Sequence, residues 1–593
     1  MLRRLGAVVL SCLSLLAVSG CALAPVAPEA GAPEAASGWT AKPGWPARKF
    51  IAVAAHPLAT RAGYEILGEG GSAVDAAIAI QMVLTLVEPQ SSGIGGGAFL
   101  LHANAREVQA WDGRESAPRR ATQGLFLQSD GRPMGFAEAT VGGRSVGTPG
   151  VLRMLEQAHR EHGRVPWARL FLPAIRLAEQ GFPVSARLAA LLKRDRGLRE
   201  DSEAGSYFFG PDGQARPAGY LLKNPALARS LQRIAGEGAD AFYRGQIAAA
   251  MVAKVASHPR NPGLLREDDL MSYRALKREP LCGEYRQWRV CGMPPPSSGG
   301  IAILQMLGML ETTAIARLGP ISGQPQQQAV HLFAEAGRLA FADRARYVAD
   351  TDFVPLPGGS PVALLDKAYL ARRSSMIGDT SLGTAAAGRP LAAPVAMGQD
   401  QSPGLPSTSH ISVVDADGNA VTMTTSIERA FGSRLMVNGF LLNNQLTDFS
   451  FLPADRDGPI ANRVEPGKRP RSAMSPTLVF DRSTGELVLA IGSPGGPAII
   501  NYVAKALVGV LDWGLDVQQA IDLPNFGSRN GPTELEAGRF PPGFADSLRA
   551  RGHAVVSIEQ TSGLHGIQRM KRGRGEQWFA GADPRREGVA MGE

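Results

Sequence analysis

The chain has 593 residues, of which 44% are hydrophobic and 20% charged, and its formal net charge is +8 at pH 7. This length and composition predict a globular protein with enough apolar residues for several domains' worth of core. The positive charge predicts solubility and loose attraction to anionic surfaces. The sequence has no helix-turn-helix, zinc-finger or aromatic-basic pattern, so we expect no nucleic-acid partner. The nine histidines show no metal-ligand spacing, and we expect neither a metal nor another cofactor.

The first 48 residues have the pattern of an export signal and a tether. A basic start precedes an apolar run, Leu5 to Val18, that is too short to span a bilayer. Val18-Ser19-Gly20-Cys21 resembles a bacterial lipobox, which predicts a signal peptide over 1–20 and acylation of Cys21. The alternative is a plain secretory signal with an incidental cysteine. Ala22 is not the Asp of an inner-membrane retention signal, so we expect an exported protein anchored in the outer membrane and facing the periplasm. Residues 21–48 are rich in Ala, Pro and Gly and predict a flexible tether.

The next segment begins with a strand and two helices. Phe50 to Ala55 predicts a strand, and the helices are predicted over Leu58–Leu67 and Ala73–Leu86. The second helix is apolar on nearly all sides, which favours a buried position. The glycines from Gly93 to Gly97 lack the Lys-Ser/Thr of a P-loop, so we exclude phosphate binding. Strands are then predicted over Ala98–His102 and Val108–Asp112.

A mainly helical region follows. The predicted helices cover Val151–His162, Trp167–Gln180, Ala186–Lys193, Pro225–Ala235, Asp240–His258, Gly300–Leu310 and Ala329–Val348. They are interrupted by a predicted hairpin from Cys282 to Cys291, with its turn at Arg286-Gln287. That register places the two cysteines opposite each other, about 4.5–5.5 Å apart at Cα and within disulfide reach. Export permits the bond, and two unoxidised cysteines are the equally weighted alternative.

The residues after a loop rich in Gly, Ala, Pro and Ser, Leu382 to Leu405, predict mostly strands. Ser409–Asp415 and Ala420–Ser426 form a predicted hairpin around the tight turn Asp417-Gly418-Asn419. Further strands are predicted over Phe440–Leu442, Thr477–Phe480 and Leu487–Ile491, and a buried helix over Pro497–Leu511. Thr408 therefore lies at the start of a strand.

A hydroxyl at such a position can act twice. The side chain of Thr408 can attack the carbonyl of Ser407, and hydrolysis of the resulting ester leaves Thr408 as a new N-terminus. Its free α-amine, with a pKa of about 7.7–8.0, can then take the hydroxyl proton. Judged from these residues alone, an ordinary β residue is the more common outcome.

Motifs found in a fixed order along the chain favour the interpretation of Thr408 as a nucleophile over that of an ordinary β residue. They are Glu88-Pro89, Gly93–Gly97, Arg114-Glu115, Ser145–Gly150, Met293–Gly300, Thr408-Ser409-His410, Asp417–Val421, Leu442–Gln445, Asp448-Phe449, Arg469-Pro470, Met474–Thr477 and Gly492–Gly496. Together they resemble the gamma-glutamyltranspeptidases from about Ile51 to Gly592. The resemblance implies an α+β fold of the N-terminal-nucleophile hydrolase type, a four-layer αββα sandwich with two stacked sheets between helix layers. It also implies self-cleavage between Ser407 and Thr408 into a heavy subunit, 49–407, and a light subunit, 408–593, that stay together as a heterodimer.

The resemblance further implies the reaction. The family opens γ-glutamyl amides such as glutathione through an acyl-enzyme and passes the acyl group to water, an amino acid or a peptide. By position, Thr408 is the nucleophile, Ser426 supports it, and the amides of Gly495 and Gly496 face the oxyanion.

The same resemblance implies a pocket for the α-carboxylate and α-ammonium of the donor. Arg114 and Ser472 are expected to bind the carboxylate, and Ala473 occupies a position where the family commonly has a second Ser. Gln445 and Asp448 are expected to bind the ammonium, and so is Glu428, which occupies a position that is often Asn in the family. The alternative for Arg114 is a surface ion pair, and that for Glu428 is a solvent-facing pair with Arg429 or Arg434.

Two other functions compete with this interpretation. One is an acylase of the same fold that removes a glutaryl group from a β-lactam nucleus, but Asp448 and Glu428 argue against a donor without an α-amine. The other is an unprocessed, inactive binding lipoprotein. The stretch Ser450–Lys468, where many relatives carry a lid, lacks Tyr and contains prolines, so we expect an open site.

Overall fold

The computed structural model describes residues 36–390, 397–402, 407–572 and 575–593. The predicted signal peptide, Cys21, the tether up to residue 35 and parts of the loop Leu382–Leu405 lie outside the described residues. Within the described ranges, no helix combines the length and the apolar character that a membrane span requires.

Two seven-stranded antiparallel sheets form the centre of the fold. The first sheet has the order β23-β2-β10-β11-β3-β4-β7 (Val589–Gly592, Ile51–Ala54, Ser409–Val414, Ala420–Ser426, Gly97–Ala103, Val108–Gly113, Leu276–Arg278). The second has the order β1-β22-β21-β17-β16-β9-β8 (Trp45–Ala47, Gly575–Ala582, His565–Arg572, Leu487–Gly492, Thr477–Asp481, Trp288–Gly292, Leu281–Tyr285). Each sheet contains strands from both sides of the Ser407–Thr408 bond.

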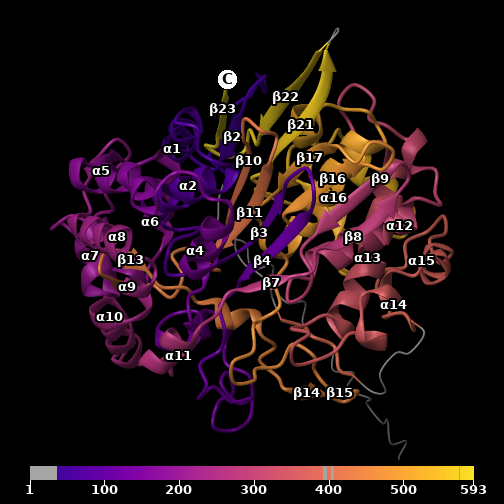
Figure 1. Cartoon of the computed structure of the whole chain (residues 1–593). Helices are drawn as coiled ribbons and strands as arrows, with labels where there is room; N and C mark the ends of the chain where they lie inside the picture. The colour runs from indigo at the N-terminus through magenta and orange to yellow at the C-terminus, as the bar shows by residue number, and fades with distance from the viewer. Residues whose placement is uncertain (1–35, 391–396, 403–406, 573–574) are drawn as a thin grey trace, which may run out of the picture. The chain divides into compact units, whose positions relative to one another are not determined.

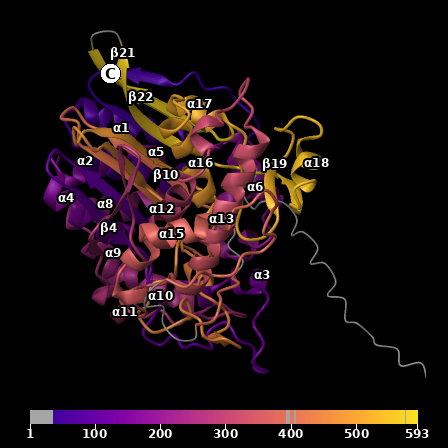
Figure 2. The same cartoon turned by 90° about the vertical axis from the view of Figure 1, so that its right-hand side faces the viewer.

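Helices cover the outer face of each sheet, and the inner faces pack together. On the first sheet lie α1 (Pro57–Gly68), α2 (Ala73–Val87) and α4 (Val151–His162). On the second lie α12 (Gly299–Leu310), α16 (Ile499–Leu511) and α17 (Val517–Asp522), with α13 (Gln327–Tyr347) and α15 (Lys367–Ser374) against α12. Strands β10 and β11 contact β17 across the sandwich. Figure 1 shows the first helix layer on the left and the second on the right, and Figure 2 looks onto α12, α13 and α15. The predicted four-layer αββα sandwich is confirmed.

Helix α2 shows why the layers form. All of its residues are buried, as the apolar sequence predicts, because it lies between the first sheet and the other helices of its layer. Its start is fixed by a capping box in which Ser72 Oγ accepts from the Asp75 amide at 3.1 Å and Asp75 Oδ2 accepts from the Ser72 amide at 2.9 Å.

Three predicted helices differ from the structure. The range Asp240–His258 is two helices, α9 (Asp240–Tyr243) and α10 (Gly245–Ala256), because Arg244 is extended and Gly245 has φ +66°. The range Trp167–Gln180 starts as a 3-10 turn, Trp167–Phe171, before α5 (Leu172–Gln180). Pro497–Leu511 likewise begins with a 3-10 turn, Gly496–Ala498, ahead of α16. Short 3-10 turns are frequent at the ends of α-helices.

The remaining elements are shorter or peripheral. The helices are α3 (Phe136–Ala139), α6 (Ala186–Arg194), α7 (Ser202–Phe208), α8 (Pro225–Glu237), α11 (Glu267–Ser272), α14 (Val362–Leu365) and α18 (Phe544–Arg549). The strands are β5 (Phe182–Pro183), β6 (Leu221–Leu222), β12 (Met436–Val437), β13 (Phe440–Leu441), β14 (Ala454–Asp455), β15 (Gly458–Pro459), β18 (Phe526–Ser528), β19 (Thr533–Glu536) and β20 (Val555–Ile558). The predicted strand Phe440–Leu442 is thus the short β13.

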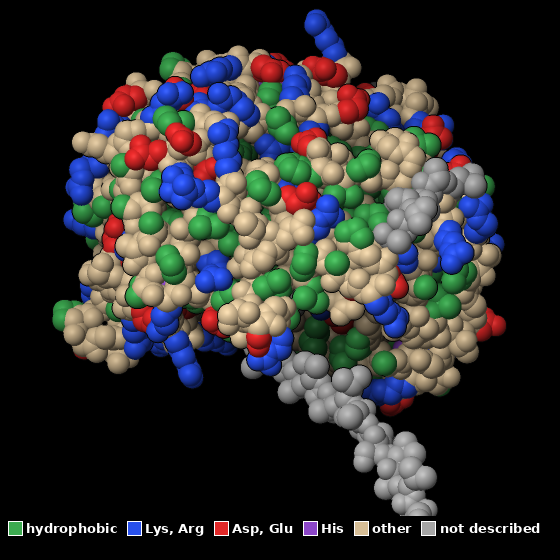
Figure 3. All heavy atoms as spheres, turned by 90° about the horizontal axis from the view of Figure 1, so that it is seen from below, with side chains coloured by type: hydrophobic (Ala, Val, Ile, Leu, Met, Phe, Trp, Pro, Cys, Tyr) green, Lys and Arg blue, Asp and Glu red, His purple; other side chains and the backbone are tan. Residues whose placement is uncertain are grey.

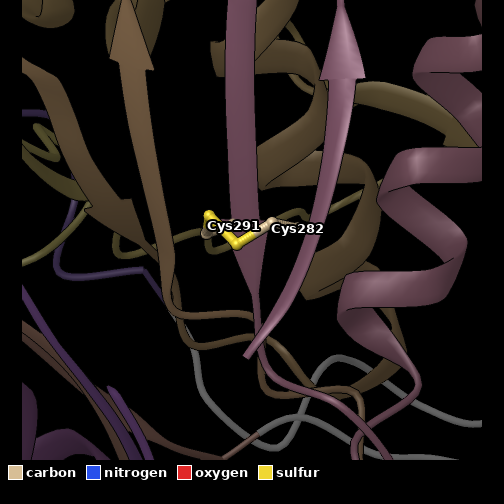
Figure 4. Close-up of a disulfide and its surroundings, with 2 residues drawn as sticks. All are labelled: Cys282 and Cys291. Carbon is tan, nitrogen blue, oxygen red and sulfur yellow. A yellow bond between two sulfur atoms is a disulfide. The ribbon is translucent and has the colours of Figure 1, made fainter. Parts of the chain in front are cut away.

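The cysteine hairpin forms the edge of the second sheet. Cys282 on β8 pairs directly with Cys291 on β9, and a disulfide joins them (Figure 4). Their Cα atoms are 4.0 Å apart, closer than the predicted range. The turn at Arg286-Gln287 is confirmed, with Arg286 in the left-handed region at φ +52°.

The surface carries both signs of charge. The face seen in Figure 3 has Lys and Arg side chains interspersed with Asp and Glu. On this face the positive charges are therefore interspersed with negative ones and form no single basic patch.

Candidate active site

Thr408 lies immediately before β10 and is 3% exposed. The register of the β10–β11 hairpin pairs Ser409 with Thr425, so Thr408 and Ser426 lie at the same end of the ladder. The Thr408 hydroxyl hydrogen-bonds to the carbonyl oxygen of Ser407. The Ser426 hydroxyl donates to that same oxygen at 2.9 Å. Two hydroxyls therefore meet at the carbonyl of the predicted cleavage site.

The residues on either side of Thr408 are tied to the segment that follows α2. The Ser407 hydroxyl donates to the Gln90 carbonyl at 2.6 Å, and the Ser409 hydroxyl donates to Glu88 Oε2 at 2.7 Å. Glu88 is itself held by a buried ion pair with Arg187 at 2.6 Å. In the sequence Glu88 belongs to a motif, but no local pattern connects Glu88, Gln90 or Arg187 to Thr408.

A pocket with about 550 Å³ of empty space, counted to its open mouth, lies in front of Thr408. Most of the sequence-predicted site residues line it: Arg114, Ser407, Thr408, Ser426, Glu428, Gln445, Asp448, Ser472, Ala473 and Gly496. Six further lining residues were not predicted: Arg344, Ser402, Arg471, Met474, Pro497 and Ile499. No residue of Ser450–Lys468 is among the described residues that line the pocket.

Three lining residues form what we call the acidic cluster: the carboxylates Glu428 and Asp448 and the side-chain amide of Gln445. Asp448 Oδ2 accepts from Gln445 Nε2 at 2.8 Å and from Arg114 Nη2. Glu428 is 4% exposed, and burial, followed by the negative charge of Asp448, raises its pKa well above the ordinary value. Glu428 therefore does not face solvent, and Arg434 pairs with Asp195 at 2.9 Å. The positive charge of Arg429, the other partner in the solvent-facing alternative, does act on Glu428 and opposes the rise of its pKa.

The backbone explains how Glu428 reaches the pocket. It is the second residue after β11 and has φ +76°, an uncommon conformation for a residue with a side chain. Its amide donates to Ser426 Oγ at 2.8 Å, so the same serine hydroxyl accepts from Glu428 and donates to the Ser407 carbonyl. Residues at Thr408 and in the acidic cluster are therefore coupled through Ser426.

Arg114 is delivered by the end of β4 and is 1% exposed, so the predicted alternative of a surface ion pair is wrong. Its Nε donates to the Pro470 carbonyl and its Nη2 to the Arg471 carbonyl, each at 3.1 Å. Glu115 Oε2 lies 3.8 Å from Arg114 Nη1, and burial raises the pKa of Glu115 to about 8. Arg114 is thus fixed chiefly by two carbonyls and by Asp448.

Ser472 and Ala473 directly follow Pro470 and Arg471, whose carbonyls bind Arg114. Ser472 Oγ accepts from the Met474 amide at 3.1 Å, which leaves the hydroxyl proton available to a ligand. The Ser298 hydroxyl donates to the Ser472 carbonyl at 2.6 Å, and Arg344 Nε donates to Ser298 Oγ at 2.7 Å. We call the two arginines Arg114 and Arg344, together with Ser472, the basic cluster of the pocket.

Gly495 and Gly496 introduce the 3-10 turn before α16. Their φ angles are +135° and +55°, and a Cβ atom on Gly495 would lie 2.6 Å from the Tyr502 ring. Only glycine fits this backbone without strain. Gly496 lines the pocket, whereas Gly495 precedes it as the cap of the turn.

The fold also brings together His331, Glu335 and His553, which the sequence did not connect. His331 Nδ1 and His553 Nε2 are 2.8 Å apart, and the remaining ring nitrogens contact the Gly378 carbonyl and the Thr533 hydroxyl. Glu335 accepts from Arg338, Ser381 and the Leu382 amide. Burial lowers the pKa of His553 to about 4. All these polar groups have protein partners, so hydrogen bonds and the ion pair between Glu335 and Arg338 account for the cluster without an ion.

Two stacked antiparallel sheets between helix layers, with a threonine at the start of a central strand, define the N-terminal-nucleophile hydrolase fold. The gamma-glutamyltranspeptidase family model matches residues 59–593, and the chain belongs to this family. It is 36% identical over 550 residues to a glutathione hydrolase proenzyme of Escherichia coli, covering 91% of each chain.

Acylases are also similar to the chain. An Acylase ACY 1 proenzyme of Pseudomonas sp. (strain V22) is 36% identical and covers 88% of this chain and 90% of its own. The crystal structure of a cephalosporin acylase from Bacillus halodurans superposes with a TM-score of 0.80 at 26% identity, covering 94% of this chain and 98% of that one.

Proposed function

We propose that the chain is a self-processing γ-glutamyltransferase and hydrolase that cleaves γ-glutamyl amides such as glutathione through a γ-glutamyl-threonine acyl-enzyme. The observation that carries the proposal is the position of the Thr408 and Ser426 hydroxyls on the Ser407 carbonyl, inside a pocket with a carboxylate and a guanidinium. Family membership supports hydrolysis of this class of amide.

Self-cleavage would begin with attack of Thr408 Oγ1 on the carbonyl carbon of Ser407. Negative charge then develops on the Ser407 oxygen, where the Ser426 hydroxyl already donates at 2.9 Å. Collapse of the intermediate breaks the C–N bond and moves the acyl group from the Thr408 nitrogen to its oxygen. Water hydrolyses the ester, leaving a carboxylate on Ser407 and a free amine on Thr408.

The processed site would use the same hydroxyl on a donor amide. The Thr408 amine takes the hydroxyl proton as Oγ1 attacks the γ-carbonyl, and amides at Gly495 and Gly496 stabilise the oxyanion. The leaving amine takes up a proton, and water or the amine of an acceptor amino acid or peptide then releases the γ-glutamyl group. No metal or other cofactor is needed in this sequence of steps.

The pocket would select the donor by its charges. The α-ammonium gains charge-assisted hydrogen bonds from the acidic cluster, and the α-carboxylate is bound by Arg114 and Ser472. Ala473 offers no hydroxyl, so this chain has one fewer donor for the carboxylate than the family pattern.

The two subunits would remain associated after cleavage. In the first sheet β10 pairs with β2, and in the second β16 pairs with β9, so strands from both sides of Thr408 are hydrogen-bonded neighbours in each sheet. Separating them would break both sheets and expose the core. An ion pair between Asp400 and Arg471, 2.7 Å long, adds a further link between the two sides.

We also propose export and lipid anchoring through Cys21, because the N-terminal pattern is basic, then apolar, then a lipobox. Two or more acyl chains anchor stably, whereas one binds reversibly. Cys21→Ser should leave the protein unprocessed or move it from the membrane fraction to the soluble periplasm. Wild-type protein that is wholly soluble after export would contradict this proposal.

A second candidate is an acylase that removes glutaryl groups, and the similarity to two acylases favours it. The test compares kcat/KM for γ-glutamyl and glutaryl p-nitroanilide on purified, processed enzyme, with and without an acceptor dipeptide. We expect faster release from the γ-glutamyl donor and a further increase with the acceptor. Preference for the glutaryl donor would replace the first function with the second, and a single unprocessed band without release would contradict both.

A further inference from the structure

Arg344 lines the pocket although it belongs to none of the sequence motifs. It lies near the C-terminal end of α13 and is partly buried. Its Nε donates to Ser298 Oγ at 2.7 Å, and the guanidinium lies 5.5 Å from the centre of the Phe341 ring. Within the described parts of the chain, no acceptor contacts its Nη1 or Nη2 and no carboxylate is within ion-pair distance.

The other two guanidinium groups of the pocket are paired. Arg471 contacts Asp400 at 2.7 Å, and Arg114 contacts Asp448. A partly buried charge without a carboxylate in direct contact is unfavourable, because protein replaces water around it and only the more distant Asp400 and Asp448 supply opposite charge. Burial and the positive charge of Arg471 accordingly lower the pKa of Arg344, yet a guanidinium remains protonated in proteins. An anionic ligand would relieve this cost.

Arg114 alone is poorly placed to take a carboxylate. A guanidinium has five N–H donors, and three of those on Arg114 are engaged by Pro470, Arg471 and Asp448. Among the described residues, only the Arg114 Nη1 group has no hydrogen-bond partner, and it lies 3.8 Å from Glu115 Oε2. A two-pronged contact through Nε and Nη2 would require Arg114 to give up protein partners. Further donors must therefore complete the carboxylate site.

Arg344 is positioned to supply them. Through Ser298 it is joined to the carbonyl of Ser472, the residue whose hydroxyl is free to donate to a ligand. The neighbouring Ala473 has no polar side-chain atom. Thus the pocket lining includes Arg344, whose two Nη groups are unengaged among the described residues, as well as Ala473, which offers no hydroxyl.

We propose that Arg344 binds the α-carboxylate of the donor together with Arg114 and Ser472, and is a specificity-determining residue for donors that carry this group. The inference rests on the proposed function and deepens it. It also balances the charges of the pocket, since the acidic cluster receives the ammonium and Arg344 receives the carboxylate of one zwitterion.

Three p-nitroanilide donors test the proposal. The γ-glutamyl donor has both charged groups, the glutaryl donor only the carboxylate, and the 4-aminobutyryl donor only the ammonium. Arg344→Gln should lower kcat/KM about 10- to 100-fold for the first two, mainly through KM, and leave the third within about twofold. Arg344→Lys keeps a positive charge and should recover part of the loss.

Arg346→Gln is the matched control. This arginine lies two positions further along α13, contacts the Tyr347 ring and does not line the pocket. It should behave as wild type with all three donors. Equal losses on all three donors in Arg344→Gln, or no loss at all, would overturn the inference.

A binding measurement separates this inference from the proposed function. L-Glutamate and 4-aminobutyrate differ in the α-carboxylate, and their binding, read as a rise in Tm, needs no turnover. Wild type should be stabilised more by glutamate, and Arg344→Gln should lose that difference. If glutamate keeps its advantage in the variant, the inference fails. A wild type that binds glutamate but hydrolyses no donor would contradict the proposed function alone.

Discussion

The acidic cluster and the basic cluster of the pocket are assembled in different ways. Glu428, Gln445 and Asp448 come from one stretch of chain after β11, whereas Arg114, Arg344 and Ser472 come from three distant segments. Asp448 is held by Gln445 and Arg114, although Glu428 Oε2 and Gln445 Oε1 are buried without a hydrogen-bond partner among the described residues. The Nη groups of Arg344 likewise have no partner among the described residues. Both clusters therefore leave polar atoms for a ligand, but the central carboxylate Asp448 is fixed by two side-chain contacts, whereas the Arg344 guanidinium is held through its Nε alone.

Asp448→Asn should produce the largest effect, because it removes the negative charge that Arg114 and an ammonium share. We expect kcat/KM to fall about 10- to 100-fold for the γ-glutamyl and 4-aminobutyryl donors, the loss typical of a hydrogen bond between charged groups. The glutaryl donor should lose little or gain, since Arg114 is released from its partner. Equal losses on all three donors would mean that Asp448 is structural and that the acidic cluster does not bind the ammonium.

Glu428→Gln should have a smaller effect that depends on pH. Burial and Asp448 raise the pKa of Glu428, so its charge is present only above that raised value. For the γ-glutamyl donor, kcat/KM of wild type should therefore rise with pH through this titration, while the variant lacks this limb. At high pH the variant should be about tenfold slower, and at low pH the two should converge.

The measurement is kcat/KM for both proteins from about pH 5 to 9. The glutaryl donor serves as the control, because it offers no ammonium and should not follow the Glu428 titration with the same sign. A constant ratio of wild type to variant across this range would contradict the role of Glu428 charge.

Ala473→Ser should have the smallest effect and acts on the other cluster. The added hydroxyl can donate to the α-carboxylate, so donors with this group should gain about two- to tenfold in kcat/KM, one modest hydrogen bond. The 4-aminobutyryl donor should not change. A gain of the same size in an Arg344→Gln background would show that the two positions act independently, and a larger gain would show that they serve the same group.

The two clusters also differ in how far they could be predicted. The hairpin turn at Asp417–Asn419 and the alternation of β10 and β11 fix the register, so the location of Thr408 beside Ser426 followed from local patterns. Motifs located Glu428, Gln445 and Asp448, but not the orientation of Glu428, which depends on its positive φ. Arg344 could not be predicted, because only the packing of α13 against the Ser298–Ser472 contact brings a helix residue into the pocket.

Other differences have the same origin. The sequence of Asp240–His258 is helical throughout by periodicity, yet Gly245 adopts φ +66° and divides it. His331, Glu335 and His553 lie far apart in sequence and meet only through the tertiary fold. By contrast, the order of strands and buried helices in the sandwich could be predicted from the sequence, because a helix that is apolar on all sides, such as α2, indicates a buried position.

Self-cleavage at Thr408 is the central claim, and the intact mass of the purified protein tests it most directly, with N-terminal sequencing of each fragment. Wild type should yield two chains that co-purify, one beginning at Thr408 and ending at Glu593. Thr408→Ala should remain a single chain and release no nitroaniline, because it has neither the attacking hydroxyl nor the N-terminal threonine. A Thr408→Ala protein that still divides between positions 407 and 408, or a wild type that is active as one uncut chain, would contradict the account.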